Sequence, residues 1–397
     1  MAKQKDAIEE MKEVLKSAEE LMEKEEYVKA KRINSQYDQH KQADARTEKL
    51  KRIDFSKLSP ERTEHFKKQN LEAFTAFRNA KSFIGSMFDR IVPFTAKELI
   101  LILGQTGGGK TAAMSNIVWS TIKQKNPETG QYGKVLVISN EETETDILNR
   151  IACLYIMEIQ GNDGEKWHYV DRSRFTAEQV AKLNEFIDRF HGSGLINIIG
   201  LDYEGELEFT CYLENIREIL NHAASCPGQY DCIVLDYYQQ IRMSLAKPDL
   251  NQWLVQAEFA GMINSYKEKV SCPIVIMAQT DEPKKDKTWK DRIVGTKAIS
   301  QPCTFIMEAC AKKSTFTTEW IIHKARYANN GTSKVVTGFK YGRVVPIDED
   351  FQTWAKEEIK KRAERESAQK KGQRDLEDHA EKSNLDSVLE SDGSNKK

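Results

Sequence analysis

The chain has 397 residues, enough for one large domain or two, and 39% are hydrophobic, so a core can form without disulfides or metal. Charged residues make up 30%, but 60 Lys and Arg nearly balance 61 Asp and Glu, which excludes a uniformly basic nucleic-acid coat. No apolar run is long enough to span a membrane. Seven scattered Cys without a C-x-x-C pair argue against a zinc site or disulfide framework. We expect a reduced, cytoplasmic protein.

Residues 1–80 are expected to form a helical N-terminal region and linker. Over 1–52 the apolar residues recur at helical spacing, and neither Gly nor Pro interrupts them. Ser59, Pro60 and Glu61 match the start of a second helix, with Ser at the cap and Pro at the first position. These helices are interpreted either as solvated or as an oligomerisation or partner-docking element, and disorder is a third reading.

Five short apolar runs follow, and helical stretches separate them. They lie at 98–103, 135–138, 195–199, 232–235 and 273–277. Runs that are apolar on both faces are typical of buried strands, so the pattern predicts an α/β fold whose central, mainly parallel sheet has helices on both faces.

The last part of the chain changes character twice. Runs at 319–323 and 334–340, on either side of the turn signal at 329–331, predict a terminal antiparallel pair. Residues 355–397 are expected to form a charged helix and then a disordered, acidic, Ser-rich tail.

The strongest motif is GQTGGGKT at 104–111, which fits the P-loop pattern G-x-x-x-x-G-K-[ST] between a strand-like and a helix-like run. The pattern predicts ATP as ligand, because backbone N–H groups at a helix N-terminus surround phosphates. Lys110 would reach the β- and γ-phosphates, and the Thr111 hydroxyl would bind Mg²⁺. The nucleotide-binding candidates are Gly104, Gln105, Thr106, Gly107, Gly108, Gly109, Lys110 and Thr111.

Polar residues at the ends of three other runs complete a hydrolytic site. Asp236 follows the run 232–235 and is expected at the carboxyl end of a strand, where it would be the second Mg²⁺ ligand or, alternatively, a helix cap. Glu141 and Glu142 follow the second run, and either is a candidate general base. Gln279 is a candidate sensor of the γ-phosphate, or simply a polar strand end.

In chain order these pieces resemble the RecA-like ATPases and, within them, the superfamily 4 DnaB-type hexameric replicative helicases, in a compact, phage-type version. The matching segments, spread over about 80–350, are GQTGGGKT, VLVISNEE, CIVLDYYQQIR, PIVIMAQT and IIHKARYANNGT. The resemblance implies a RecA-like ATPase domain at 81–354 that uses ATP and Mg²⁺. It also implies a homohexamer that moves 5′ to 3′ on single-stranded DNA and unwinds duplex DNA in replication, with a primase or loader as a partner.

The resemblance also assigns roles to single residues. Glu141 occupies the family's catalytic glutamate position, although Glu142 stands where relatives often have an apolar residue. Lys324 and Arg326 match a Lys-x-Arg pair that reaches the neighbouring subunit's ATP; otherwise they are two exposed strand cations. Relatives carry a larger N-terminal domain and a zinc-bearing primase region, so no priming activity is expected here.

A loop rich in Lys and Arg surrounds Trp289 after the fifth run. Similar helicases line the central channel of their ring with this loop, and cations there would hold a single strand without regard to its sequence. The alternative is an ordinary solvated loop. The DNA-binding candidates are Lys284, Lys285, Lys287, Lys290, Arg292, Gly295, Thr296 and Lys297.

Two other functions share the same ATP-site residues. A RecA-like recombination or repair ATPase would form filaments, but we find no convincing short aromatic anchor before the core. A nucleotide-switched scaffold would use ATP only to set its oligomeric state, and Glu141 argues against this because a switch needs no positioned base.

Overall fold

The computed structural model describes residues 64, 66–71, 97–125, 130–160, 167, 169–206, 208–243, 251–282, 287–326, 334–365 and 367. The chain divides into two compact units, Met1–Ala73 and Phe74–Lys397. In the first, residues 64 and 66–71 are helical. The predicted helices over 1–52 and from Ser59, the turn at 329–331 and the tail beyond 367 lie outside the described residues. The domain boundaries at 80 and 354 stay predictions.

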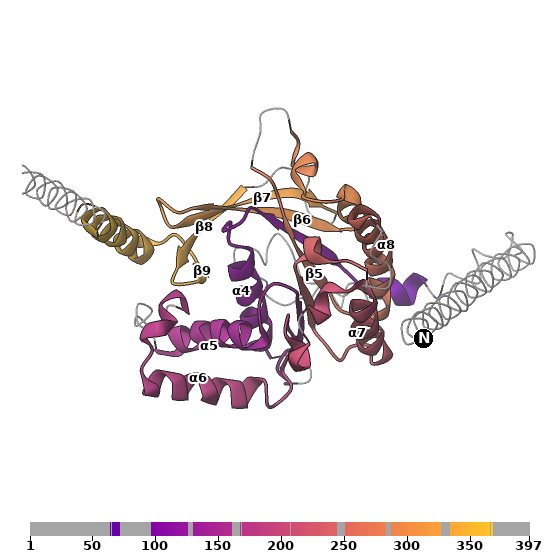
Figure 1. Ribbon diagram of the computed structural model, residues 1–397, viewed down its shortest axis with the longest axis horizontal. Helices are drawn as coiled ribbons and strands as arrows, with labels where there is room; N and C mark the ends of the chain where they lie inside the picture. Colours follow the sequence, from indigo (N-terminus) through magenta and orange to yellow (C-terminus); the bar gives the residue numbers. More distant parts are fainter. Residues whose placement is uncertain are drawn as a thin grey trace, which may run out of the picture. The chain divides into compact units, whose positions relative to one another are not determined.

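The second unit is built on a nine-stranded sheet of order β3-β2-β4-β5-β1-β6-β7-β8-β9 (Figure 1). Its strands are β1 Leu99–Gly104, β2 Val135–Ser139, β3 Ile196–Ile199, β4 Cys232–Asp236, β5 Ile274–Gln279, β6 Phe305–Lys312, β7 Thr317–Ala325, β8 Lys334–Lys340 and β9 Arg343–Val345. The six strands from β3 to β6 pair in parallel, and β6 to β9 continue as antiparallel neighbours. The predicted parallel sheet with a terminal antiparallel pair is confirmed.

Helices connect the parallel strands and cover both faces of the sheet (Figure 1). They are α4 Lys110–Ile122, α5 Glu144–Gln160, α6 Ala177–Phe190, α7 Leu213–Ser225 and α8 Gln252–Lys269, and residues 349–365 form a further helix near the C-terminal end. Short 3-10 helices are η2 Tyr169–Arg174, η3 Tyr203–Gly205, η4 Phe209–Cys211, η5 Tyr238–Gln240, η6 Trp289–Arg292 and η7 Lys297–Ser300.

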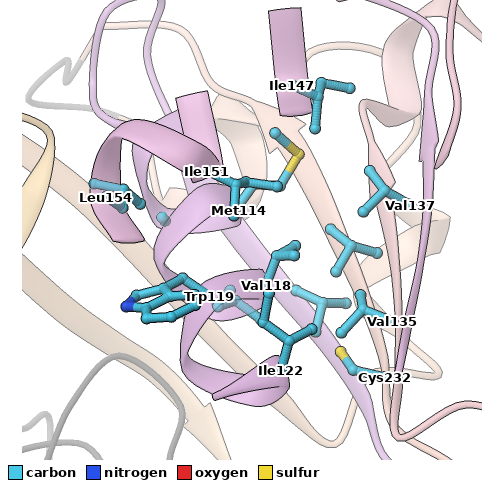
Figure 2. Close-up of a cluster of buried hydrophobic side chains, with 14 of the residues drawn as sticks. Met114, Val118, Trp119, Ile122, Val135, Val137, Ile147, Ile151, Leu154 and Cys232 are labelled. Atoms are coloured by element: carbon cyan, nitrogen blue, oxygen red, sulfur yellow. The ribbon is translucent and has the colours of Figure 1, made fainter. Parts of the chain in front are cut away.

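Two apolar clusters sandwich the sheet, and β1 contributes to both. Ile100 and Ile102 belong to the cluster with α4, α5 and α6, which Figure 2 shows around Met114 and Val118 of α4. Leu101 lies in the opposite cluster, with α7 and α8. Successive strand residues point to opposite faces, so a strand covered on both sides must be apolar throughout. This is why the central strands are continuous apolar runs.

The strand β6 was not predicted from the sequence. Its residues Phe305–Lys312 pair in parallel with β1 and antiparallel with β7, so it is the point where the sheet changes direction. Glu308 interrupts its apolar run, which hides the strand from a search for continuous hydrophobic residues. The burial of this carboxylate, at 1% exposure, depends on its ion pair with Arg292, which lies outside the strand.

Truncation on either face of β1 should destabilise the protein to a similar extent. We expect Ile102→Ala and Leu101→Ala each to lower the free energy of unfolding by about 2–5 kcal/mol, because both side chains are fully buried. Val180→Ala, on the exposed face of α6, is the control and should change it by less than about 0.5 kcal/mol. Urea titration followed by circular dichroism measures this. A loss at only one of the two core positions would contradict the two-sided packing.

Candidate active site at the carboxyl ends of the strands

The P-loop connects β1 to α4 and closes tightly on itself. The Gly108 N–H donates to the Gln105 carbonyl over 2.9 Å, and a Cβ at Gly108 would come within 2.9 Å of the same oxygen. Gly109 precedes α4 with φ of 100°, a left-handed conformation that favours glycine. The motif therefore ends at a helix N-terminus, where free N–H groups and the helix dipole favour an anion.

Lys110, the first residue of α4, points back over this loop. Its Nζ donates to the carbonyl oxygens of Gly104 and Gln105, each over 3.0 Å. Burial lowers the pKa of Lys110, and the carboxylates of Asp236 and Glu141 oppose that shift. The ammonium is thus partly desolvated inside an acidic cluster at the end of the P-loop, which is a suitable position for contact with phosphate.

Asp236 ends β4 and is completely buried. Among the described residues, no hydrogen-bond donor reaches either of its carboxylate oxygens. Burial, with Glu141 and Glu142 nearby, raises the pKa of Asp236 to about 7. A buried carboxylate without donors is unfavourable unless a cation binds it, so this group has the chemistry of a metal ligand.

The side chain of Asn140 locks the ends of β2 and β4 together. The Tyr237 N–H donates to Asn140 Oδ1 over 2.7 Å, and the Asn140 N–H donates to the Asp236 carbonyl over 2.8 Å. These bonds fix the two acidic positions, Glu141 and Asp236, relative to each other. The role of Asn140 could not be predicted from the sequence, because an Asn after a strand is an ordinary turn residue.

The two adjacent glutamates have different environments. Glu142 Oε1 accepts a hydrogen bond from the Arg150 guanidinium over 2.5 Å. Glu141 lines the pocket beside the P-loop together with Lys110 and Thr111. Loss of hydration raises the pKa of Glu141, with Lys110 acting in the opposite direction. The pairing of Glu142 with α5 leaves Glu141 as the carboxylate that faces the pocket.

Gln279, at the end of β5, meets the P-loop directly. Its Nε2 donates to Thr106 Oγ1 over 2.8 Å. The β1–β5 register places Gly104 opposite Gln279, so this contact follows from strand pairing. The backbone of Gln279 is also held, since its N–H donates to Gln239 Oε1 over 2.9 Å.

The pocket of about 370 Å³ over the P-loop is lined by polar and by apolar residues, which we call its polar half and its apolar half. The polar half holds the P-loop residues, Glu141, Arg150 and Gln279, as described above. Leu154 and Met157 of α5, with Phe339 and Tyr341 from the end of β8 and the turn after it, form the apolar half. A cleft of this kind suits a ligand with a charged end and a flat aromatic end. This apolar half of the pocket was not predicted from the sequence.

Lys324 lies near the end of β7, and Arg326 directly follows the strand. Neither residue is among the described residues that line the pocket over the P-loop. Lys324 Nζ donates to the carbonyls of Ser300 and Gln301 over 3.3 and 3.2 Å. Burial lowers the pKa of Lys324, and Arg326, Lys290 and Lys267 lower it further. These cations therefore lie close enough to repel one another, and an anion that binds among them would reduce this repulsion.

The family model described as the DnaB-like helicase C terminal domain matches residues 86–343. The chain belongs to the DnaB-like helicases. It is an ATP-driven DNA helicase, and the P-loop, Asp236 and Glu141 described above lie within the matched region. No curated protein matches the chain significantly.

Solved structures agree on the fold of this helicase. A structure described as an ATPase domain matches with a TM-score of 0.53 and 14% identity, over 72% of this chain and 98% of that one. A DnaB-like replicative helicase, described with its interactions with primase, matches with a TM-score of 0.50 and 16% identity, over 70% of this chain and 65% of that one. The predicted RecA-like α/β core is confirmed. Among the described residues, no helix has the length and apolar character to cross a membrane.

The basic loop of the helicase is less exposed than the sequence implied. Lys287, Lys290, Gly295 and Lys297 are exposed, while Lys284 and Lys285 lie outside the described residues. Arg292 is buried and forms two hydrogen bonds with Glu308, over 2.7 and 2.6 Å. The prediction that Arg292 contacts DNA does not fit this geometry, because its guanidinium neutralises the buried carboxylate of β6.

Thr296 also differs from the prediction that it contacts DNA. The residue is buried, and its backbone N–H donates to Gln256 Oε1 over 3.0 Å. Its carbonyl accepts from the Tyr238 hydroxyl over 3.1 Å. Both backbone groups of Thr296 form hydrogen bonds inside the protein, so this residue anchors the loop and its backbone is not available to bind DNA.

Glutamine side chains hold the end of this loop against the strand that carries Gln279. Gln239 Nε2 donates to the carbonyls of Gln279 and Val294, over 3.1 and 2.9 Å. The carbonyl of Gln239 accepts from Gln256 Nε2 over 3.2 Å, and Gln256 in turn holds Thr296. A continuous hydrogen-bonded path thus joins the candidate γ-phosphate sensor to the basic loop.

The Glu308 cluster supports a prediction about pH. His323 Nε2 lies 2.8 Å from Glu308 Oε2, and Trp289 stacks on His323 with 4.9 Å between ring centroids. Hydrogen bonds from His323 and Arg292 outweigh burial and lower the pKa of Glu308 to about 2. A carboxyl whose pKa is depressed by folding stabilises the protein above its unfolded pKa, and this stabilisation is lost as the pH falls through the folded pKa.

We therefore expect Glu308→Gln to lower the free energy of unfolding by about 3–5 kcal/mol at pH 7, because it leaves the Arg292 charge buried and unpaired. The difference from wild type should shrink as the pH falls below about 4.5, where the wild-type carboxyl begins to protonate in the unfolded chain. Urea titrations at pH 7 and below measure it. Equal stability of the two proteins at pH 7 would show that the cluster contributes nothing.

Proposed function

We propose that this helicase is a ring-forming replicative motor that hydrolyses ATP between neighbouring subunits, probing the γ-phosphate with Gln279 and moving on single-stranded DNA. The observation that carries the proposal is the buried, donor-free carboxylate of Asp236 beside Lys110 and Glu141. Polar residues gathered at the carboxyl ends of parallel strands form the ligand site of open α/β sheets.

The residues present fit a magnesium nucleotide. Asp236 and the Thr111 hydroxyl would hold Mg²⁺, which supplies positive charge to the phosphates. The P-loop N–H groups and Lys110 would bind the phosphates. The base would lie against Phe339 and Tyr341, the apolar half of the pocket.

We assign Glu141 as the general base that accepts a proton from the attacking water. The pKa of Glu141 is raised and so lies closer to neutral pH than that of an ordinary carboxylate. A general base works best when its pKa is close to the working pH. Glu142 is committed to Arg150, so its role is to orient α5 and the start of the pocket wall. Gln279 can donate its amide to the γ-phosphate because the β1–β5 register holds it at the P-loop.

Lys324 and Arg326 would act on the ATP of the adjacent subunit. They lie outside the pocket of their own chain, and Lys324 sits in a cluster of cations. A cation delivered in trans typically accelerates phosphoryl transfer by about 10³–10⁵-fold. A head-to-tail contact of this kind closes into a ring when the rotation permits, and we propose a hexamer with 5′ to 3′ movement.

The setting of the motor is part of the same proposal. We propose that the protein acts in the cytoplasm, and that the exposed Lys287, Lys290 and Lys297 would contact the single strand. A primase or a loader is the proposed partner, by analogy with the solved helicase described with its primase.

The first test is ATP hydrolysis with and without single-stranded DNA. Wild type should be stimulated, and Lys287→Ala/Lys290→Ala should lose most of the stimulation while basal turnover persists, because both cations are exposed on the loop. Lys182→Ala on α6 is the matched control for the loss of a surface cation, and it should behave like wild type. Wild-type turnover that DNA does not change would contradict the motor.

The second test separates the two sides of the ATP site. Arg326→Ala and Glu141→Gln should each bind ATP but lose turnover by about 10²-fold or more. Mixed in equal amounts, they should regain activity at about one interface in four, where an intact Glu141 meets an intact Arg326 from its neighbour. Absence of any recovery in mixed oligomers that are shown to form would rule out the trans assignment.

A further inference from the structure

The turn between β8 and β9 carries Tyr341 on the wall of the nucleotide pocket. Tyr341 and Gly342 have φ of 52° and 86°, so both central residues of this two-residue turn are left-handed. Such turns match the twist of a hairpin, but the first position suits Asn or Gly far better than an aromatic residue. Tyr341 therefore needs contacts that hold it in this conformation.

One anchor comes from the P-loop helix. Asn116 Nδ2 donates to the Gly342 carbonyl over 2.8 Å, and the Val344 N–H donates to Asn116 Oδ1 over 3.1 Å. Asn116 lies within two turns of Lys110 on α4. The hairpin is thus pinned to the helix that begins at the phosphate-binding loop.

The second anchor is Trp354, in the helix at 349–365. Its indole Nε1 donates to the Tyr341 hydroxyl over 2.9 Å, and the two rings meet edge to face with 5.2 Å between centroids. Trp354 also packs against Phe316, again with 5.2 Å between centroids. The indole fixes both the position of the phenol oxygen and the tilt of the ring.

The helix that carries Trp354 starts beside β8 and β9 (Figure 1). The Phe351 N–H donates to Asp348 Oδ1 over 2.8 Å, which caps the helix start. Phe351 is buried, and its ring lies so close to β8 that a Cβ at Gly338 would come within 2.5 Å of it. The placement of Trp354 is therefore a fixed feature of the fold.

We propose that Trp354 is a positioning residue that sets nucleotide affinity by holding the Tyr341 ring against the base. The inference rests on the proposed function, since it assumes that a nucleotide occupies the P-loop pocket. It assigns the helix at 349–365 a part in the ATP site although Trp354 itself does not line the pocket. Because the contact between Trp354 and Tyr341 is remote from the γ-phosphate, its loss should weaken nucleotide binding but leave the rate of the hydrolysis step unchanged.

The test is a cycle of Trp354→Phe, Tyr341→Phe and the double variant. Each single change keeps a ring and removes one partner of the same hydrogen bond. We expect the KM for ATP to rise about threefold to tenfold in each single variant, and no further in the double variant, because all three lack one and the same bond. The kcat of Trp354→Phe at saturating ATP and DNA should stay within about twofold of wild type.

Two controls separate positioning from loss of stability. Trp119→Phe removes another indole hydrogen bond, to Glu158, and should leave the KM unchanged. Inhibition by pyrophosphate, which has no base, should be equal in wild type and Trp354→Phe, whereas inhibition by ADP should weaken by the same factor as the KM.

An unchanged KM in Trp354→Phe, additive effects in the double variant, or equal weakening of pyrophosphate would overturn the inference. These outcomes are distinct from failure of the proposed function. If the wild-type protein does not hydrolyse ATP, the proposed function itself is wrong. If the wild type hydrolyses ATP and Trp354→Phe has the same KM, only the role of Trp354 is wrong.

Discussion

The pairing of four parallel strands in register is the constraint on which the site depends. Gly104 lies opposite Gln279 in the β1–β5 pair, and Ser139 lies opposite Asp236 in the β2–β4 pair. Because parallel strands end at one edge, the residues that follow each strand meet there even though they are far apart in sequence. The apolar content of the strands is what holds this register, since a slip by one residue would expose one whole face of each strand.

At this edge the fold tolerates an unfavourable arrangement of charge. Asp236 is buried without a donor, and Lys110 is desolvated beside it. Two apolar clusters provide the stability that permits this, and the cation and polyphosphate of the proposed function would lower the energy of the acidic cluster. A second buried charge, Glu308, is treated differently, since Arg292 and His323 compensate it completely within the chain. The two carboxylates thus differ in their chemistry, since Glu308 is paired within the chain, whereas Asp236 has the chemistry of a metal ligand.

The sequence allowed the central strands, the P-loop and the polar strand ends to be predicted, because each has a strong local signal. A continuous apolar run marks β1, and a fixed spacing of glycines marks the loop after it. Arg292 shows where local reading fails. Its neighbours are Lys and Asp, so it looks like one more solvated cation, and only the tertiary structure reveals that it pairs with Glu308 of β6. The same long-range pairing explains why β6 itself was missed.

The apolar half of the pocket could not be predicted for a related reason. Tyr341 and Phe339 are common strand and turn residues, and no spacing links them to the P-loop far earlier in the chain. What links them is Asn116, which bonds to the hairpin from α4, and Trp354, which bonds to Tyr341 from the last described helix. In the proposed function, nucleotide recognition would therefore depend on two kinds of element. The phosphate end of the proposed site lies in one contiguous motif, whereas the proposed base end depends on the packing of the β8–β9 hairpin and the helix after it against α4, which is far away in the sequence.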